Sequence, residues 1–285
     1  MKKSISSLLW GALILAISLL SQIVVVSIYS FLNIFTTSFK SAAAGGDPNL
    51  IAQEASKSIE TAIQAEMYWL IPLAGIVSIF FLWVYTKARK QSFREELKFN
   101  KFSLKGIIAT FFVGVALTSV VGIFLQLTGL PEMFNESQEL VDSLVGGGNV
   151  LLTLIGVGIL VPIIEELTFR GFLLSTLSRG FKVYIAVVIQ ALCFAAFHGN
   201  ILQASYTFFV GLVAGLLVVW FKSVKPAIML HVGFNSVNVL AAHFIQKNEV
   251  LTSTILGIFI LIGLTISVYG LVKLKPWKQT KLVTE

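Results

Sequence analysis

The segment Val161–Arg170 (VPIIEELTFR) places two adjacent carboxylates and an arginine directly behind the apolar run 150–164. A charged side chain at membrane depth costs about 2.5–3.5 kcal/mol on insertion scales, so membrane proteins that carry several there normally use them. If the segment is helical, Glu166 and Arg170 lie four residues apart on one face, in the favourable acid-first order. Glu165 is then rotated by about 100° and lacks that partner. The pattern predicts one carboxylate held structurally and one free for chemistry.

The composition of the 285-residue chain is typical of a membrane protein. Hydrophobic residues make up 56% of the chain, charged residues 12%, and the mean hydropathy is +0.88, which excludes an ordinary soluble domain. The net charge of +7 does not indicate nucleic-acid binding, because lysine and arginine stand at the ends of apolar runs instead of along one face. The single cysteine, Cys193, excludes an internal disulfide and a thiolate metal cluster.

The apolar runs predict an all-α, polytopic transmembrane helix bundle of about eight spans. Most runs are close to the roughly 20 residues that cross the hydrocarbon core, but the fifth is short, and we expect it to be recessed or to thin the bilayer. The first run is too long for the apolar part of a signal peptide, so we expect it to be retained. The expected spans are 8–35, 68–85, 104–127, one that starts near Asn149, 184–197, 202–221, 226–244 and 250–272.

The loop charges give an orientation. Lysine and arginine concentrate after the second, fourth, sixth and eighth spans, whereas acidic residues occupy the alternate connections. By the positive-inside rule, this distribution places both termini in the cytoplasm.

Two of the outer connections carry helical patterns of their own. After Asp47-Pro48, an N-cap with proline at the first helical position, apolar residues recur at helical spacing as far as Ile63. This predicts an amphipathic helix on the outer surface, with an ordinary ordered loop as the alternative. Residues 133–145 show a weaker form of the pattern and lead into Gly146–Gly148, where we expect a flexible joint.

Polar residues inside the later spans predict a site built from three helices. His198 ends the fifth span, and His231 and Asn235 share one face of the seventh. A single intramembrane histidine is equally well explained by packing and a hydrogen bond to the backbone. Together with Glu165 and its charged neighbours, however, these residues predict a convergent polar cluster.

The depths estimated for the three helices do not agree with one another. At about 1.5 Å per residue, Glu165 and His198 lie roughly 20 and 24 Å from the cytoplasmic side, but His231 lies only about 9 Å from it. Either the seventh span begins deeper than its sequence indicates, or the helix after Glu166 bends toward the cytoplasm.

Three motifs in order resemble a known family: Glu-Glu-x-x-x-Arg at 165–170, Phe-x-x-x-His at 194–198 and His-x-x-x-Asn at 231–235. They resemble the CPBP family, which includes type II CAAX prenyl endopeptidases and the Abi proteins related to bacteriocin processing and self-immunity. The resemblance covers about 149–244, which would form a catalytic core. It would follow an N-terminal region, 1–148, of transmembrane helices and outer amphipathic segments. A last transmembrane helix and a basic cytoplasmic tail, 245–285, would complete the chain.

The resemblance implies a multi-pass protein of the cell membrane that acts as an endopeptidase on a membrane-associated, hydrophobic or CAAX-like peptide. Glu165 and His198 would activate the attacking water, which agrees with the role of a carboxylate and an imidazole in general base catalysis. His231 and Asn235 would stabilise the oxyanion, since both can present N–H groups on one helix face.

The resemblance also bears on the remaining residues and on a metal. Glu166 and Arg170 would brace the site. The family is often described as metalloproteases, and Glu165 with the imidazoles of His198 and His231 would form a zinc set of the His₂Glu kind. However, His-Glu-x-x-His is absent and the three ligands would come from three helices. Zinc and a metal-free glutamate–histidine mechanism therefore both stay open.

Two other classes of function compete with the protease. One is a non-catalytic immunity or regulatory protein that binds a partner through the same polar cavity, although such a protein has no need of an unpaired Glu165 opposite His198. The other is a transporter with a glutamate–histidine proton relay, which predicts inverted repeats that the hydropathy pattern lacks. The expected partners are the lipid bilayer and a peptide or protein substrate, and nucleic acid is not among them; the sequence does not give the oligomeric state.

Overall fold

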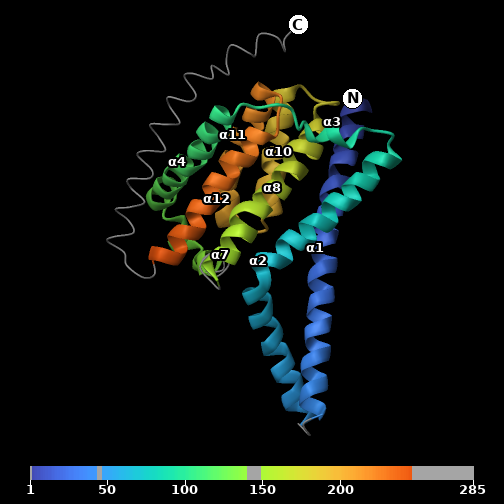
Figure 1. Cartoon of the computed structure of the whole chain (residues 1–285), viewed down its shortest axis with the longest axis vertical. Helices are drawn as coiled ribbons and strands as arrows, with labels where there is room; N and C mark the ends of the chain where they lie inside the picture. The colour runs from blue at the N-terminus through green and yellow to red at the C-terminus, as the bar shows by residue number, and fades with distance from the viewer. Residues whose placement is uncertain (1, 44–46, 140–148, 246–285) are drawn as a thin grey trace.

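The computed structural model describes residues 2–43, 47–139 and 149–245, and within these ranges the protein is all-helical, without strands (Figure 1). Six helices are long and apolar enough to cross a bilayer, which makes the chain a multi-pass membrane protein. The long helices are α1 (Lys2–Ala43), α2 (Pro48–Ala88), α4 (Leu104–Thr128), the composite helix Val150–Leu177, α11 (Ile201–Phe221) and α12 (Lys225–Ile245). The shorter ones include α3 (Phe93–Leu97), α5 (Leu130–Met133) and α10 (Val183–Phe197).

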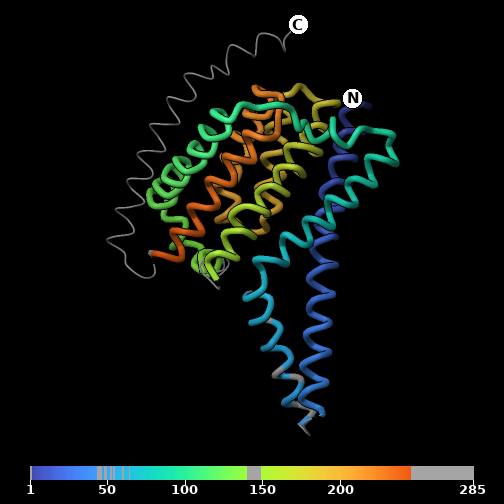
Figure 2. Tube along the Cα trace, in the orientation of Figure 1, coloured from blue at the N-terminus to red at the C-terminus, as the bar shows by residue number. Residues whose placement is uncertain are grey.

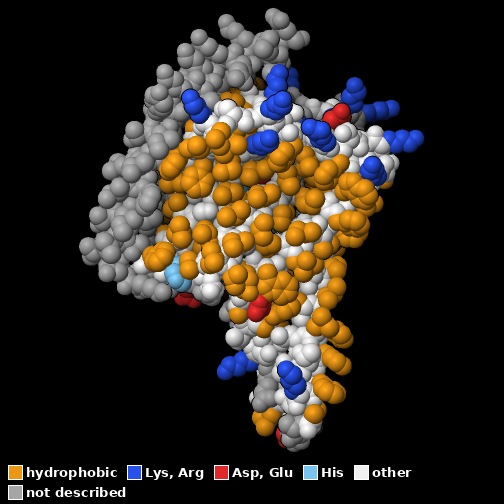
Figure 3. Space-filling model, in the orientation of Figure 1, with side chains coloured by type: hydrophobic (Ala, Val, Ile, Leu, Met, Phe, Trp, Pro, Cys, Tyr) orange, Lys and Arg blue, Asp and Glu red, His pale blue; other side chains and the backbone are white. Residues whose placement is uncertain are grey.

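These helices correspond to the first seven predicted spans. The fifth, α10, is a short apolar helix of 15 residues, as the sequence predicts. The eighth span, 250–272, and the glycine joint Gly146–Gly148 lie outside the described residues. In the space-filling view a broad apolar band covers the bundle, and lysine and arginine side chains gather along the edge near the N-terminus (Figure 3).

Helices α1 and α2 form an antiparallel hairpin that extends past the rest of the bundle (Figure 2). The segment after Pro48 is helical, but it is the first part of α2 and not a separate helix on the outer surface. It packs on α1, where Ser58 Oγ donates to Asn33 Oδ1 at 3.0 Å and the rings of Tyr29 and Trp69 meet edge to face at 5.6 Å.

Glycine allows α12 to approach its neighbour α4 very closely. A Cβ atom at Gly114 of α4 would lie 1.8 Å from the carbonyl oxygen of Leu230, and one at Gly233 of α12 would lie 2.2 Å from that of Phe111. No larger residue fits at either position, so backbones touch where side chains would normally separate them. This contact holds α12, which carries His231 and Asn235, at a fixed distance from α4.

The connection between α2 and α4 ties the end of the composite helix to the start of α12. Glu96 of α3 forms an ion pair with Arg179, and its carbonyl oxygen accepts a hydrogen bond from Ser175 Oγ at 3.0 Å. Burial raises the pKa of the Glu96 carboxyl, and Arg179 opposes this rise. Two residues later, the carbonyl oxygen of Lys98 accepts the N–H of Val224 at 3.1 Å.

The same connection covers the start of α12. Val224 is fully buried immediately before α12 begins, because the loop at Lys98 lies over it. The seventh span therefore starts beneath this loop, and its His231 comes within 3.7 Å of Glu165 although the sequence places the two residues at different depths.

The glycine contact gives a test of the packing. Gly114→Ala should force α4 and α12 apart, because the new methyl group meets backbone that cannot move aside, and overpacking of this kind costs about 1–3 kcal/mol or more. Thermal unfolding in detergent should show a clear decrease in the midpoint. Gly122→Ala is the matched control on the same helix, since a Cβ there meets nothing within 4 Å. Equal midpoints for the two variants would contradict this packing.

Candidate active site

The helix that carries the adjacent glutamates changes its winding twice. It consists of α7 (Val150–Thr153), the π-helical segment η1 (Leu154–Leu160), α8 (Val161–Glu166), a second π-helical segment η2 (Leu167–Leu173) and α9 (Leu174–Leu177). Single π-helical turns inside α-helices are rare and frequently occur at functional sites. Here they flank the single α-helical stretch that ends in Glu165 and Glu166.

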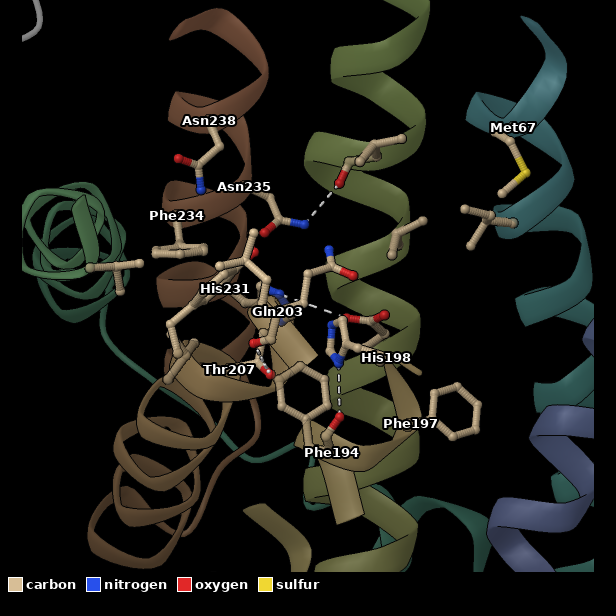
Figure 4. Close-up of a pocket in the computed structure, with 18 of the residues that line it drawn as sticks. Met67, Phe194, Phe197, His198, Gln203, Thr207, His231, Phe234, Asn235 and Asn238 are labelled. Carbon is tan, nitrogen blue, oxygen red and sulfur yellow. Dashed lines mark hydrogen bonds and ion pairs between the residues drawn. The ribbon is translucent and has the colours of Figure 1, made fainter. Parts of the chain in front are cut away.

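Pro162 leaves a backbone carbonyl of this helix free to accept a hydrogen bond from α12. In η1 the N–H of Val161 bonds the carbonyl of Gly156, and Pro162 has no N–H. The carbonyl of Val157 therefore has no donor four or five residues further along its own helix. Asn235 of α12 supplies one, because its Nδ2 donates to this oxygen at 3.1 Å (Figure 4). The proline of the VPIIEE stretch thus creates the acceptor that holds Asn235 in place.

Glu166 is at the centre of a fully buried charge cluster. Its Oε1 lies 2.9 Å from Arg170 Nη1 and 2.8 Å from His231 Nδ1, and both Glu166 and Arg170 are 0% exposed. The guanidinium group of Arg170 also stacks over the ring of Phe194, 4.2 Å from its centroid. Because an ionised carboxylate only accepts hydrogen bonds, Nδ1 of His231 carries a hydrogen. Glu166 therefore fixes both the position and the tautomer of His231.

Glu165 has a different environment from its neighbour. Its side chain is 22% exposed, and its Oε2 lies 3.7 Å from His231 Nε2, which is longer than a hydrogen bond. No hydrogen bond to the Glu165 carboxylate occurs within the described ranges, so its oxygen lone pairs face the cavity. The structure therefore contains the expected difference between a sequestered and an accessible glutamate.

One cavity of about 650 Å³ brings the predicted residues together. Glu165, His198, His231 and Asn235 all line it, and they come from three helices far apart in the sequence (Figure 4). The ring of Phe194 lies between the two histidines, 4.8 Å from His198 and 5.7 Å from His231, edge to face with each. His198 Nδ1 lies 2.8 Å from the carbonyl oxygen of Phe194 and must donate to it, which leaves Nε2 as the basic nitrogen of the neutral ring.

The structure adds polar residues that the sequence analysis missed. Gln203, Tyr206 and Thr207 of α11 line the cavity, as does Gln22 of α1. The sequence contained only a weak signal for them, the spacing of four residues between Gln203 and Thr207 in a mostly apolar span. Asn238 lines the cavity as well, and it lies where the sequence places it, one turn beyond Asn235 on the helix face that carries His231.

The donor set for a metal does not assemble in this arrangement. Across 2–43, 47–139 and 149–245, no group of three or more His, Cys, Asp or Glu side chains is placed to hold an ion. A zinc set here would have to use Nε2 of both histidines, because Nδ1 of His231 meets Glu166 and Nδ1 of His198 meets the carbonyl oxygen of Phe194. The zinc set Glu165, His198 and His231 stays a prediction, and the mechanism below passes through no metal.

A family model described as "Type II CAAX prenyl endopeptidase Rce1-like" matches residues 147–237, a range that includes all three motifs. Residues 147–237 are an Rce1-like domain. The match confirms the resemblance to the CPBP family over the part of the chain that builds the Glu/His network. The Rce1-like domain contains Glu165, His198, His231 and Asn235, whereas α1, α2 and α4 lie outside it. Comparisons with curated proteins and with solved structures gave no match.

The buried cluster predicts a large loss of stability when its cation is removed. Arg170→Met keeps much of the side-chain volume but leaves the Glu166 carboxylate without its cation, and breaking one side of a buried pair costs about 3–5 kcal/mol. Thermal unfolding in detergent should register this as a decrease of many degrees. Glu165→Gln is the control, because Glu165 lines the cavity and has no such partner. A melting midpoint for Arg170→Met within a degree of the wild type would contradict the buried pair.

Proposed function

We propose that the Rce1-like domain is an intramembrane endopeptidase that hydrolyses a peptide bond of a membrane-associated peptide or protein in the cavity between α10, α11, α12 and the composite helix. The observation that supports this most directly is the different environment of the two adjacent glutamates. Glu165 lies in the cavity beside two imidazoles, whereas Glu166 is buried behind it. The family match supports a protein or peptide as the substrate.

In the first step Glu165 and His198 activate water. The Glu165 carboxylate has free acceptor positions in the cavity, and His198 has a basic Nε2 because its Nδ1 donates to the backbone. A water hydrogen-bonded to Glu165 transfers its proton as its oxygen attacks the carbonyl carbon of the substrate. The attack converts the planar carbonyl into a tetrahedral intermediate with a negatively charged oxygen.

In the second step His231 and Asn235 stabilise that oxygen. Nδ1–H of His231 is occupied by Glu166, so Nε2 donates only when the ring is an imidazolium. With that charge, the group of Glu165, Glu166, Arg170 and His231 is neutral overall. Asn235 Nδ2 has a second hydrogen besides the one that Val157 accepts. Donors of this kind typically contribute about 2.7–4 kcal/mol each to the transition state.

The third step releases the products. The intermediate expels the amine as the C–N bond breaks, and the amine nitrogen takes the proton that Glu165 received from water. The products are a carboxylate and an amine, and Glu165 returns to its ionised form.

Cleavage of defined probes by purified protein in liposomes tests this proposal. Two quenched fluorescent peptides serve as probes, a farnesylated CAAX peptide and an unprenylated hydrophobic peptide. We expect the wild type to cleave at least one of them. Glu165→Gln and His231→Ala should each lower kcat by about 100-fold or more, since general base and oxyanion residues contribute factors of this size. His243→Ala, outside the cavity, is the control and should cleave at the wild-type rate.

The same cleavage assay also tests whether the activity requires a metal. Activity that is lost with a chelator and restored by zinc would assign a metal to the site, and activity that withstands chelation would favour the metal-free mechanism. Cleavage that persists in both Glu165→Gln and His231→Ala at equal protein amount would contradict the proposed site. Binding of a probe without cleavage by the wild type would favour a non-catalytic binding protein.

A further inference from the structure

Of the cavity-lining carboxamides that have no role in the proposed chemistry, two lie on α11 and α12. Gln203 of α11 and Asn238 of α12 line the cavity with Glu165 and His231 (Figure 4). Within the described parts of the chain, no hydrogen bond is made by either carboxamide. The neighbouring hydroxyl of Thr207 is already used, because its Oγ1 donates to the carbonyl oxygen of Gln203 at 2.8 Å.

Unpaired carboxamides are costly inside a membrane-spanning bundle. A buried amide without a hydrogen-bond partner destabilises a protein, and polar side chains at this depth normally line a pathway or a site. Both residues are partly exposed to the cavity and not sealed in the core. Their hydrogen-bonding capacity is therefore directed at whatever enters the cavity.

The cavity lining indicates that the ligand of these residues is neutral. Among the described residues that line the cavity there is no lysine or arginine, and Glu165 is the single acid. A carboxylate or phosphate ligand would lack a permanent positive charge to bind. A carboxamide offers one acceptor and two donors, which is the complement of a peptide group.

A substrate inside the membrane creates a need for such partners. A membrane-embedded helix satisfies all its backbone groups internally, and its carbonyls are not open to attack. Exposing one carbonyl to Glu165 requires several residues to unwind, and each freed N–H or C=O group then needs a new partner.

The spacing along α12 fits this role. Asn238 follows His231 by seven residues, which is about 10 Å along a helix and places it on the same face. An extended peptide covers that distance with about three residues at 3.3 Å each. A substrate whose scissile carbonyl faces His231 would therefore present backbone to Asn238 about three residues away.

We infer that Gln203 and Asn238 bind the backbone of an extended, uncharged substrate segment near the scissile bond. They are substrate-positioning residues that select for segments able to unwind, and they need no particular side chain. This inference rests on the proposed function and assigns the substrate class to the same cavity.

Kinetics with a cleaved probe test this assignment. Gln203→Leu and Asn238→Leu should each raise KM about tenfold with kcat within about twofold of the wild type, since each removes hydrogen bonds to bound substrate. Gln203→Asn and Asn238→Gln should recover part of the loss. Gln126→Leu makes the same chemical change on an exposed face of α4 and should behave as the wild type. Unfolding midpoints confirm that each variant is folded.

Ester-substituted probes separate direct contact from an indirect effect. Each peptide N–H near the scissile bond, but not the scissile bond itself, is replaced in turn by an ester oxygen. At the contacted position the ester should lower kcat/KM about tenfold in the wild type and have little effect in Gln203→Leu or in Asn238→Leu.

Three results would count against the inference, and they differ from each other. Unchanged KM in both leucine variants, with cleavage intact, would overturn it and leave the proposed function standing. If the ester lowers kcat/KM by the same factor in the leucine variants as in the wild type, these residues do not contact the substrate backbone. No cleavage of either probe by the wild type would remove the proposed function, and this inference with it.

Discussion

The buried contact between Glu166, Arg170 and His231 is the constraint on which the rest of the site depends. A carboxylate at 0% exposure needs its cation, and the cation in turn needs the ring of Phe194 and a close neighbour without a side chain. Gly211 provides that neighbour, since a Cβ there would lie 3.3 Å from Arg170 Nη2. Four transmembrane helices thus have to assemble around one charge pair before His231 can take its position.

The contacts of this cluster also determine how the side chains in the cavity wall are oriented. Glu166 holds one nitrogen of His231, so the other is turned toward Glu165. Pro162 removes a backbone donor, and Asn235 is drawn into the wall to replace it. The reactive groups are therefore positioned by interactions that lie behind them, and the cavity itself remains open to a substrate.

Much of this arrangement could be predicted from the sequence because charges inside apolar runs are expensive and few. The spacing of Glu166 and Arg170 gave their pairing, and the three motifs gave the helices that converge. The loop at Lys98 that covers the start of α12 could not be predicted, because a contact between a loop and a distant helix leaves no pattern in the sequence. Gln203 was missed because a single carboxamide in an apolar span carries no pattern strong enough to separate it from packing.

Glu165 and Glu166 are adjacent, so the fold distinguishes them by rotation alone. Each residue turns a helix by about 100°, and inserting or deleting one residue in η1 would therefore rotate Glu165, Glu166 and Arg170 together, away from His231 and the cavity. Substitution at a lipid-facing position such as Ile155 changes only what the bilayer contacts, whereas a change in length at the same point alters the register of everything that follows. The number of residues between Asn149 and Glu165 is thus a stricter requirement than their identity.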